Sequence, residues 1–323
     1  MKTSTKIWII IAAVLVAAGI TLFVIVMAPG NWNFKGLWTA EFVSTTIDVE
    51  EDFRNISFES DTARISIQPS TTGTCRVGAF THKKVITTAE VSDGTLKIRT
   101  EDTRRWYEKL SFSSDYELVL YLPRSEYDSL RIDSSTGKVL VPKDVSFGNI
   151  DIAIGTGDVD LEASASEKIR VKTSTGGILV ENVTAGELDL TSSTGDITVR
   201  SAAISGAMSF TVSTGDARIS DVTCKDLRTK GSTGDVILEN VIAAGSLSVE
   251  RSTGDVRFDK CDAQDMTVKT STGSVKGSLL TGKVFSAGSG TGKVTVPDSD
   301  AAGGKCVITT STGRINITIA GQE

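Results

Sequence analysis

Four aspartates recur at almost constant intervals in the second half of the chain. Asp196, Asp216, Asp235 and Asp255 are separated by 20, 19 and 20 residues, and Asp158 lies further back. If each interval is one coil of a repeating fold, neighbouring carboxylates lie about 5 Å apart, a separation that suits the two acids of a retaining glycosidase. Carboxylate oxygens are also ligands that Ca²⁺ prefers. The spacing is thus compatible with a catalytic pair, a cation site, or a structural turn.

The structural alternative is favoured because the aspartate column is interrupted. At the equivalent positions of other repeats the residues are Lys138, Gly177, Ser274, Lys293 and Arg314. A catalytic acid pair also needs a cleft, for which the sequence gives no signal. We therefore expect no catalytic residue, no cofactor and no metal ion, and the aspartates remain only a weak candidate site.

Nucleophilic catalysis is also not expected. The one histidine, His82, is followed by Lys83 and Lys84 and lies far from the repeats. A Ser-His-Asp arrangement would need that remote residue to meet a serine of a repeat. From residue 131 onward the chain has no tryptophan or tyrosine that would stack on a sugar.

Serine and threonine hydroxyls form a second regular pattern. A Thr-Gly pair occurs ten times, and serine precedes the threonine in eight of the ten. An outward array of hydroxyls would match a regular surface such as ice or a crystalline glycan. We expect instead that the hydroxyls face inward at a corner and satisfy backbone groups, because every coil needs its corner. The corner glycines are Gly137, Gly157, Gly176, Gly195, Gly215, Gly234, Gly254, Gly273, Gly292 and Gly313.

The elements around these corners are short strands. The residue seven before each glycine is apolar in all ten repeats, as is the residue two after it, and only Thr229 interrupts the column five before. Such alternation indicates strands with one inward face. One repeat buries too few side chains to offset the entropy of ordering it, so successive coils are expected to stack in register. The sequence predicts an all-β protein with a parallel β-solenoid over residues 130–320, of about ten coils of 19–20 residues.

A family resemblance rests on these repeats. The run YELVLYLPRSEYDSLRIDSSTGKVLV, residues 116–141, and the following STGDV and STGDI coils resemble the bacterial putative-adhesin family of β-strand-repeat proteins with a domain of unknown function, which includes the LiaG-like proteins of envelope stress. The resemblance covers about residues 47–319. It implies the β-repeat fold and brings no catalytic motif.

The N-terminus predicts a membrane anchor. Residues 7–28 carry no charge and are long enough to span a bilayer as a helix. Lys2 and Lys6 precede this run and only Lys35 follows closely, which places residues 1–6 in the cytoplasm and the solenoid outside. A cleaved signal peptide is the alternative, but its apolar region would be shorter, and Pro29 disfavours cleavage. The protein is thus expected to cross the cell membrane once.

Three further features complete the domain plan. Residues 29–46 are predicted to be a linker and residues 47–129 an N-terminal β cap over the first coil. The net charge of −6 and the pI near 5.1 indicate no nucleic-acid partner. Cys224 and Cys261 fall two coils apart, too far for a disulfide, so the four cysteines are expected to be small buried hydrophobes.

Together these patterns indicate a membrane-anchored, extracytoplasmic solenoid with a structural, adhesive or partner-binding role and no catalysis. Its expected partners are the membrane, cell-wall glycan or an envelope protein. One alternative is an accessory or regulatory protein of the envelope stress response, in which the cap contacts a membrane signalling protein. The other, a glycan-active β-helix enzyme, would need convergent acids in a cleft.

Overall fold

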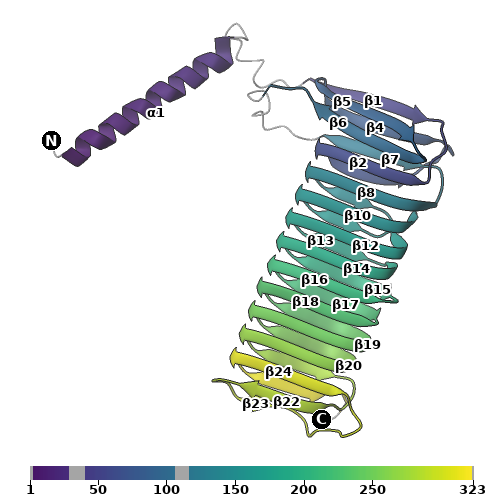
Figure 1. The fold of residues 1–323 in the computed structure, drawn as a ribbon, viewed down its shortest axis with the longest axis vertical. Helices are drawn as coiled ribbons and strands as arrows, with labels where there is room; N and C mark the ends of the chain where they lie inside the picture. Colours follow the sequence, from purple (N-terminus) through teal and green to yellow (C-terminus); the bar gives the residue numbers. More distant parts are fainter. Residues whose placement is uncertain (1–2, 29–40, 106–115, 322–323) are drawn as a thin grey trace.

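The computed structural model describes residues 3–28, 41–105 and 116–321 as one helix followed by strands that stack into a rod (Figure 1). The helix α1 (Thr3–Met27) contains the segment Ile7–Ile25, which has the length and hydropathy of a membrane-spanning helix or of a signal sequence. The rest is all-β, and the predicted solenoid of about ten turns is confirmed.

Each coil of the rod contributes one strand to each of two long ladders, here called A and B, and short pairings such as Thr184–Ala203 and Ala185–Ile204 form a third side. From the N-terminal end, ladder A contains β5 (Val85–Ser92), β6 (Thr95–Asp102), β2 (Asn55–Thr62), β8 (Glu126–Thr136), β10 (Ser146–Thr156), β12 (Ser164–Thr175), β14 (Thr184–Thr194), β16 (Ala207–Thr214), β18 (Asp226–Thr233), the second halves of β19 (Val236–Thr253) and β20 (Val256–Thr272), β24 (Lys305–Thr312) and β22 (Val284–Ser289). In the same direction, ladder B contains β1 (Phe42–Val49), β4 (Cys75–His82), β7 (Glu117–Leu122), β3 (Arg64–Pro69), β9 (Val139–Val141), β11 (Val159–Leu161), β13 (Ile178–Glu181), β15 (Ile197–Ile204), β17 (Ala217–Cys224), the first halves of β19 and β20, β21 (Val275–Leu279), β25 (Ile315–Ile319) and β23 (Val294–Thr295).

The core lies inside ladders A and B and the third, shorter side, whose buried residues include Ile204 and Ala243. In the coil that ends at Val199, the residues Leu188, Leu190, Ile197 and Val199 are at most 1% exposed. These are the inward columns predicted from the alternation, and their burial confirms that prediction. Because the register is parallel, each of these side chains packs on its equivalent in the coils above and below.

The first corner of each coil, between ladder A and ladder B, depends on glycine. Nine of the ten corner glycines have φ between 125° and 152°, a region that L side chains rarely adopt. There is also no room for a side chain, since a Cβ on Gly195 would lie 2.1 Å from the carbonyl oxygen of Gly176. The exception in φ is Gly292, in the outermost coil, but its Cβ would lie 1.7 Å from the carbonyl oxygen of Gly313.

A second corner, absent from the sequence analysis, lies six residues after the first. It is a column of left-handed residues with φ between 50° and 56°, consisting of Asn182, Ser201, Asp221, Asn240 and Lys260. Asparagine and aspartate tolerate this conformation better than most residues. Their recurrence at one offset was a signal from which this corner was predictable.

The strands β1, β4, β5, β6 and β7 close the N-terminal end and are called the cap here. β1 pairs antiparallel with β4, β4 with β7, and β5 with β6, unlike the parallel coils below. β1 begins at Phe42, inside the predicted linker, and residues 55–69 already form a coil in register with the one that follows. The predicted boundaries at residues 46 and 129 stay predictions.

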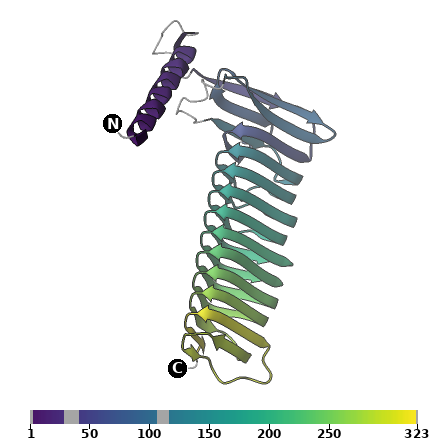
Figure 2. The same ribbon diagram turned by 60° about the vertical axis from the view of Figure 1, so that its left-hand side comes forward.

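The coils do not stack in sequence order at the other end, which we call the distal end (Figures 1 and 2). The last coil of the sequence, β24–β25, pairs with β20–β21 on one side and with β22–β23 on the other. The expectation of strictly successive stacking is therefore wrong here. The physical reason is that the inward columns of β24 and β25 are apolar except at Thr310, whose hydroxyl bonds to the carbonyl of Gly273, whereas the inward apolar residues of β22 are only Phe285 and Ala287.

The first corner makes a direct prediction about glycine. Gly195→Ala should destabilise the protein by more than about 2 kcal/mol, because the residue has positive φ and its Cβ meets a backbone oxygen. The matched control is Gly177→Ala, in the neighbouring coil, where the nearest atom to a Cβ is 3.6 Å away. Thermal melting should show a lower Tm for the first variant and an unchanged or slightly higher Tm for the second. Equal losses in the two variants would contradict this account of the corner.

Candidate functional site

The candidate aspartates form a hydrogen-bonded ladder along the first corner. In each case the carboxylate Oδ1 accepts a hydrogen bond of 2.8–2.9 Å from the backbone amide of the equivalent residue one coil further on. The carboxylates of this ladder belong to Asp158, Asp196, Asp216, Asp235 and Asp255. Each carboxylate thus satisfies an amide at a corner where the glycine has bent the backbone away from the strand ladder.

The ladder has a cation beside it and interruptions within it. Arg218 contacts Oδ2 of Asp196 at 2.8 Å and Oδ2 of Asp216 at 2.6 Å. Gly177 supplies no acceptor, so the ladder is broken between Asp158 and Asp196. At the distal end Ser274 Oγ accepts a weaker bond of 3.4 Å from the Arg314 amide.

This geometry limits what the column can do chemically. One oxygen of each carboxylate is occupied by a backbone amide, and Arg218 holds the second oxygen of two of them. Within the described residues no three acidic, histidine or cysteine side chains are grouped so as to hold a metal ion. The bonding pattern supports the structural alternative for Asp196, Asp216, Asp235 and Asp255.

The electrostatics of Asp196 follow from the same contacts. Partial burial raises the pKa of its carboxyl, but the amide of Asp216 and the guanidinium of Arg218 lower the pKa more, so the net shift is downward. Asp196 accordingly remains a carboxylate to lower pH when the protein is folded than when it is unfolded.

The corner hydroxyls lie differently from the expectation. All ten threonines that precede the corner glycines are exposed, and so are the serines before them. They stack as an outward ladder in register, as in the series Thr175, Thr194 and Thr214. The inward expectation is therefore wrong for these residues, because the two turn positions fall outside the alternation of the strand.

The hydroxyls that do satisfy the backbone lie one position earlier, three residues before the glycine. Ser192 Oγ donates to the carbonyl of Gly176 at 3.2 Å, and Thr173 Oγ1 to that of Gly157 at 3.3 Å. Thr270 and Thr310 do the same, and all four side chains are buried. This inward hydroxyl column was readable from the sequence but was not singled out.

One buried cation in the same inward column was also missed. Arg251 is only 4% exposed, and its Nη1 donates to the carbonyl of Val212 at 3.0 Å, while Nε and Nη2 have no partner among the described residues. Gly231 makes the space, since a Cβ there would lie 1.6 Å from Nη1. Burial lowers the pKa of Arg251, an effect that Asp216 and Asp235 oppose.

A second buried cation is fully bonded. The Lys283 ammonium contacts Asp262 Oδ1 at 2.6 Å, the carbonyl of Ala263 at 2.7 Å and Thr281 Oγ1 at 2.8 Å. It fastens the start of the outermost coil to the coil of β20.

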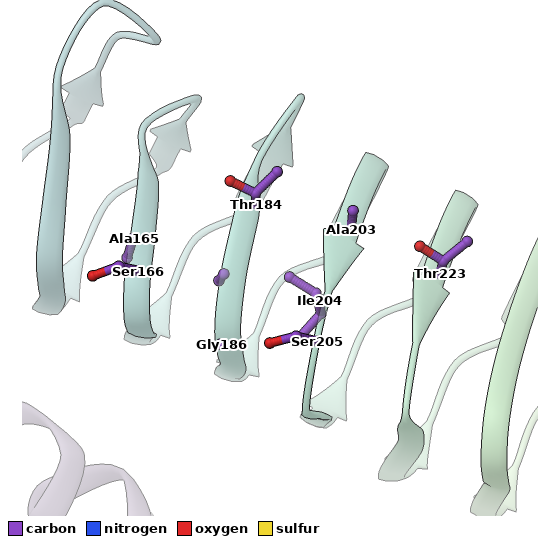
Figure 3. Close-up of a pocket in the computed structure, with 9 residues that line it drawn as sticks. Ala165, Ser166, Thr184, Gly186, Ala203, Ile204, Ser205 and Thr223 are labelled. Carbon is purple, nitrogen blue, oxygen red and sulfur yellow. The ribbon is translucent and has the colours of Figure 1, made fainter.

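Two hollows lie on the surface of the described residues. Just after the second corner, a shallow groove of about 400 Å³ runs over small side chains such as Ser166, Thr184 and Ser205 on successive coils (Figure 3). Its depth comes from the small size of these residues.

The second hollow is a cleft of about 730 Å³ between the cap and the first coils. Its rim is charged, with Arg76 paired to Asp48 and Arg124 paired to Asp52, each at 2.8 Å. Buried Tyr127 and the buried thiol of Cys75 also line it, and burial raises the pKa of Cys75 to about 12. Such a thiol is a poor nucleophile at neutral pH.

The remaining sequence candidates are placed as follows. His82 lies in the cap strand β4, where its Nδ1 accepts a bond from the Lys84 amide. Cys75, Cys224, Cys261 and Cys306 are all free and buried, which confirms the prediction for the cysteines.

The Asp196 contacts predict a pH dependence. Because its pKa is lower in the folded state, the contact contributes stability above the unfolded pKa of about 3.9 and loses it as the pH falls through the folded value. Asp196→Asn keeps an oxygen acceptor but removes the charge, so its stability deficit should shrink towards zero between pH 5 and about pH 2. Urea unfolding at several pH values measures this, with Asp61→Asn, at an exposed aspartate outside the ladder, as a control for the substitution itself. A deficit that stays constant down to pH 2 would refute the assignment.

The chain also matches solved structures of bacterial proteins, at low sequence identity. A putative adhesin from Bacteroides fragilis is 13% identical, with a TM-score of 0.42, and the match covers 87% of this chain and 98% of that one. A putative adhesin from Parabacteroides merdae is 11% identical, with a TM-score of 0.40 and coverage of 87% and 98%. A putative lipid binding protein from Parabacteroides distasonis is 16% identical, with a TM-score of 0.42 and coverage of 85% and 96%. No curated protein matches the chain.

A family model covers the rod almost completely. The model described as Toastrack DUF4097 matches residues 53–206 and again residues 205–323. The expected family of β-repeat proteins with a domain of unknown function is thereby confirmed, while the LiaG-like subgroup stays a prediction. Since the two matches together span most of its 323 residues, the chain belongs to the Toastrack DUF4097 family.

Proposed function

We propose that this protein is a membrane-anchored, extracytoplasmic rod with a structural, adhesive or partner-binding role and no catalysis. The observation that carries the proposal is the repetition of its surface. The same exposed Ser-Thr pair and the same amide-bonded aspartate recur on successive coils at the first corner. A protein surface that repeats with every coil is suited to a partner that also repeats, such as cell-wall glycan, rather than to a single small substrate.

Several features support the absence of catalysis in this proposal. The aspartates that would serve as an acid pair are bonded to backbone amides, and they lie along an exposed corner and not in the cleft. His82 is separated from the repeats, and the buried Cys75 has a raised pKa. These groups lack the convergence that general acid–base or nucleophilic catalysis needs.

A regulatory role in envelope stress is the second candidate, and the cleft at the cap favours it. Glu50 and Glu51 line this cleft beside the two arginine–aspartate pairs, so its rim is acidic overall. The chain passes from the anchor into the cap, because β1 follows α1 in the sequence. Even fully extended, the segment from Met27 to Phe42 would separate the cap from the anchor by at most about 50 Å. A partner at this cleft would therefore be a protein close to the membrane with a basic segment.

The anchor makes its own prediction. Because Ile7–Ile25 is uncharged and of spanning length, the protein should remain in the membrane fraction at its full 323-residue mass. Fractionation followed by intact mass spectrometry measures this. A mature form that begins near residue 30 and is released into the medium would remove the anchor from the proposal.

The hydroxyl ladder predicts where glycan binds. The triple variant Thr175→Glu, Thr194→Glu and Thr214→Glu places three charges on the exposed corner ladder. In co-sedimentation of the detergent-solubilised full chain with purified cell-wall glycan, this variant should bind about tenfold more weakly than the wild type, a cost of about 1.4 kcal/mol.

The matched control carries the same change at three exposed threonines on the outward face of ladder A, Thr211→Glu, Thr267→Glu and Thr309→Glu. It should bind like the wild type, and both variants should keep the circular-dichroism spectrum of the wild type. Equal binding by all three proteins would count against the corner as the binding surface.

A further inference from the structure

Exposed large apolar side chains gather at the two ends of the rod. Outside α1, the described residues contain seven, namely Val43, Phe80, Ile86, Ile242, Leu280, Val284 and Val294. The first three belong to the cap and the last three to the final coils. Of the seven, only Ile242 lies on the sides of the rod between its ends, here called the walls. An interface driven by apolar burial would therefore form at an end of the rod.

At the distal end the core is only partly covered, by the loop that carries Val296. Phe285 and Ala287 continue the buried columns of Cys306 and Ile308, to which they are paired in register. Cys306 and Ile308 are at most 1% exposed, whereas Phe285 and Ala287 are only partly buried. Ladder A thus ends with apolar side chains that a further β-strand and its inward side chains would cover.

The outer edge of β22 is bonded to the loop of residues 296–304 only at its start, and the rest of that edge is unpaired. β22 pairs with β24 on one side, and no strand of the described ranges pairs with its other side. The amides of Val284 and Gly290 donate towards β24, so alternation directs those of residues 285, 287 and 289 outwards. Ser299 Oγ occupies the amide of Phe285 at 3.0 Å. The amides of Ala287 and Ser289 are left at the open edge, a ready template for another strand.

Charged residues of opposite sign lie near the two ends of β22. The loop of residues 296–304 lies beside the start of β22, where the Asp300 amide donates to the carbonyl of Lys283. Asp298 and Asp300 in this loop are exposed. Exposed Lys293 follows the other end of the strand. An antiparallel copy of β22 would place the lysine of one chain against the acidic loop of the other.

We propose that the distal end binds the distal end of a second copy of this chain. The two β22 strands pair antiparallel about a two-fold axis near Ala287, whose amide in each copy donates to the Ala287 carbonyl of the other. Such an isologous contact uses the same surface twice and closes as a dimer. It completes the cover of the core, pairs the free edge and opposes Lys293 to Asp298.

The consequence for adhesion rests on the proposed anchoring at the cap. β22 and β23 lie at the opposite end of the rod from the cap, through which the anchor enters (Figure 1). Ladder A stacks thirteen strands from β5 to β22, which at about 4.8 Å each gives a rod of about 60 Å. Two rods joined at their distal ends and standing upright would hold two membranes about 120 Å apart.

The decisive variant removes the central hydrogen-bond donor. Ala287→Pro eliminates an amide that faces the open edge, so it is compatible with the fold of the strand but not with edge pairing. The full chain in detergent should dimerise in analytical ultracentrifugation, and the variant should dimerise at least about tenfold more weakly. The matched control Ile242→Lys, which changes the one exposed large apolar residue of the walls, should dimerise like the wild type.

A charge exchange tests the two-fold geometry. Lys293→Asp and Asp298→Lys should each weaken the dimer, and the double variant should restore it, which a merely structural role would not produce. Circular dichroism checks that every variant remains folded. In phosphatidylcholine vesicles that carry the full chain, the wild type should cluster vesicles with a spacing of about 120 Å in electron cryomicroscopy, and Ala287→Pro should not.

A wild-type chain that stays monomeric, a dimer insensitive to Ala287→Pro, or a dimer lost instead in the cap variant Val43→Lys would overturn the proposal. Failure of the anchor would look different, because the chain would still dimerise in ultracentrifugation but would not cluster vesicles.

Discussion

The fold depends on one steric constraint, the close approach of successive backbones at the first corner. The carbonyl oxygen of one corner glycine lies where a Cβ of the next would be, at 1.7–2.4 Å from that position along the column. Only glycine permits this approach, and nine of the ten corners also need its positive φ. Because every coil turns in the same way, every coil is held in register with its neighbours, and each inward column becomes a continuous apolar stack.

The polar chemistry of the corner is a consequence of this stacking. A sharp turn leaves backbone groups outside the two strand ladders, and buried or partly buried groups of that kind need partners. The aspartate after the glycine accepts the next amide, and the hydroxyl three residues before the glycine donates to a glycine carbonyl. What resembles a row of catalytic acids in the sequence is thus bonded as part of the turn. The outward threonines before the corner glycines point to solvent instead, and they form the repeating surface of the rod.

The periodicity of the sequence determined how much of the fold and of the candidate site was predictable. The apolar columns and the ten corners follow from alternation and spacing, because both repeat in the sequence as they do in space. The orientation of Thr194 and its equivalents did not follow, since the alternation stops at the turn. Arg251 was missed because its burial depends on a glycine at residue 231 in the coil before it. The stacking order at the distal end was also beyond reach, because equivalent repeats carry no information about which of them are neighbours.

The reversed order of the last two coils has a consequence for biosynthesis. Residues 284–295 leave the ribosome before residues 305–319, yet in the finished protein they are joined to the body of the rod through the later segment. The nascent chain therefore holds its outermost layer without a permanent template until Ile319 has been made. Any earlier pairing of β22 with β20 has to open again to admit β24, so this end of the rod matures only once residues 305–319 are available, and their loss would detach two layers instead of one.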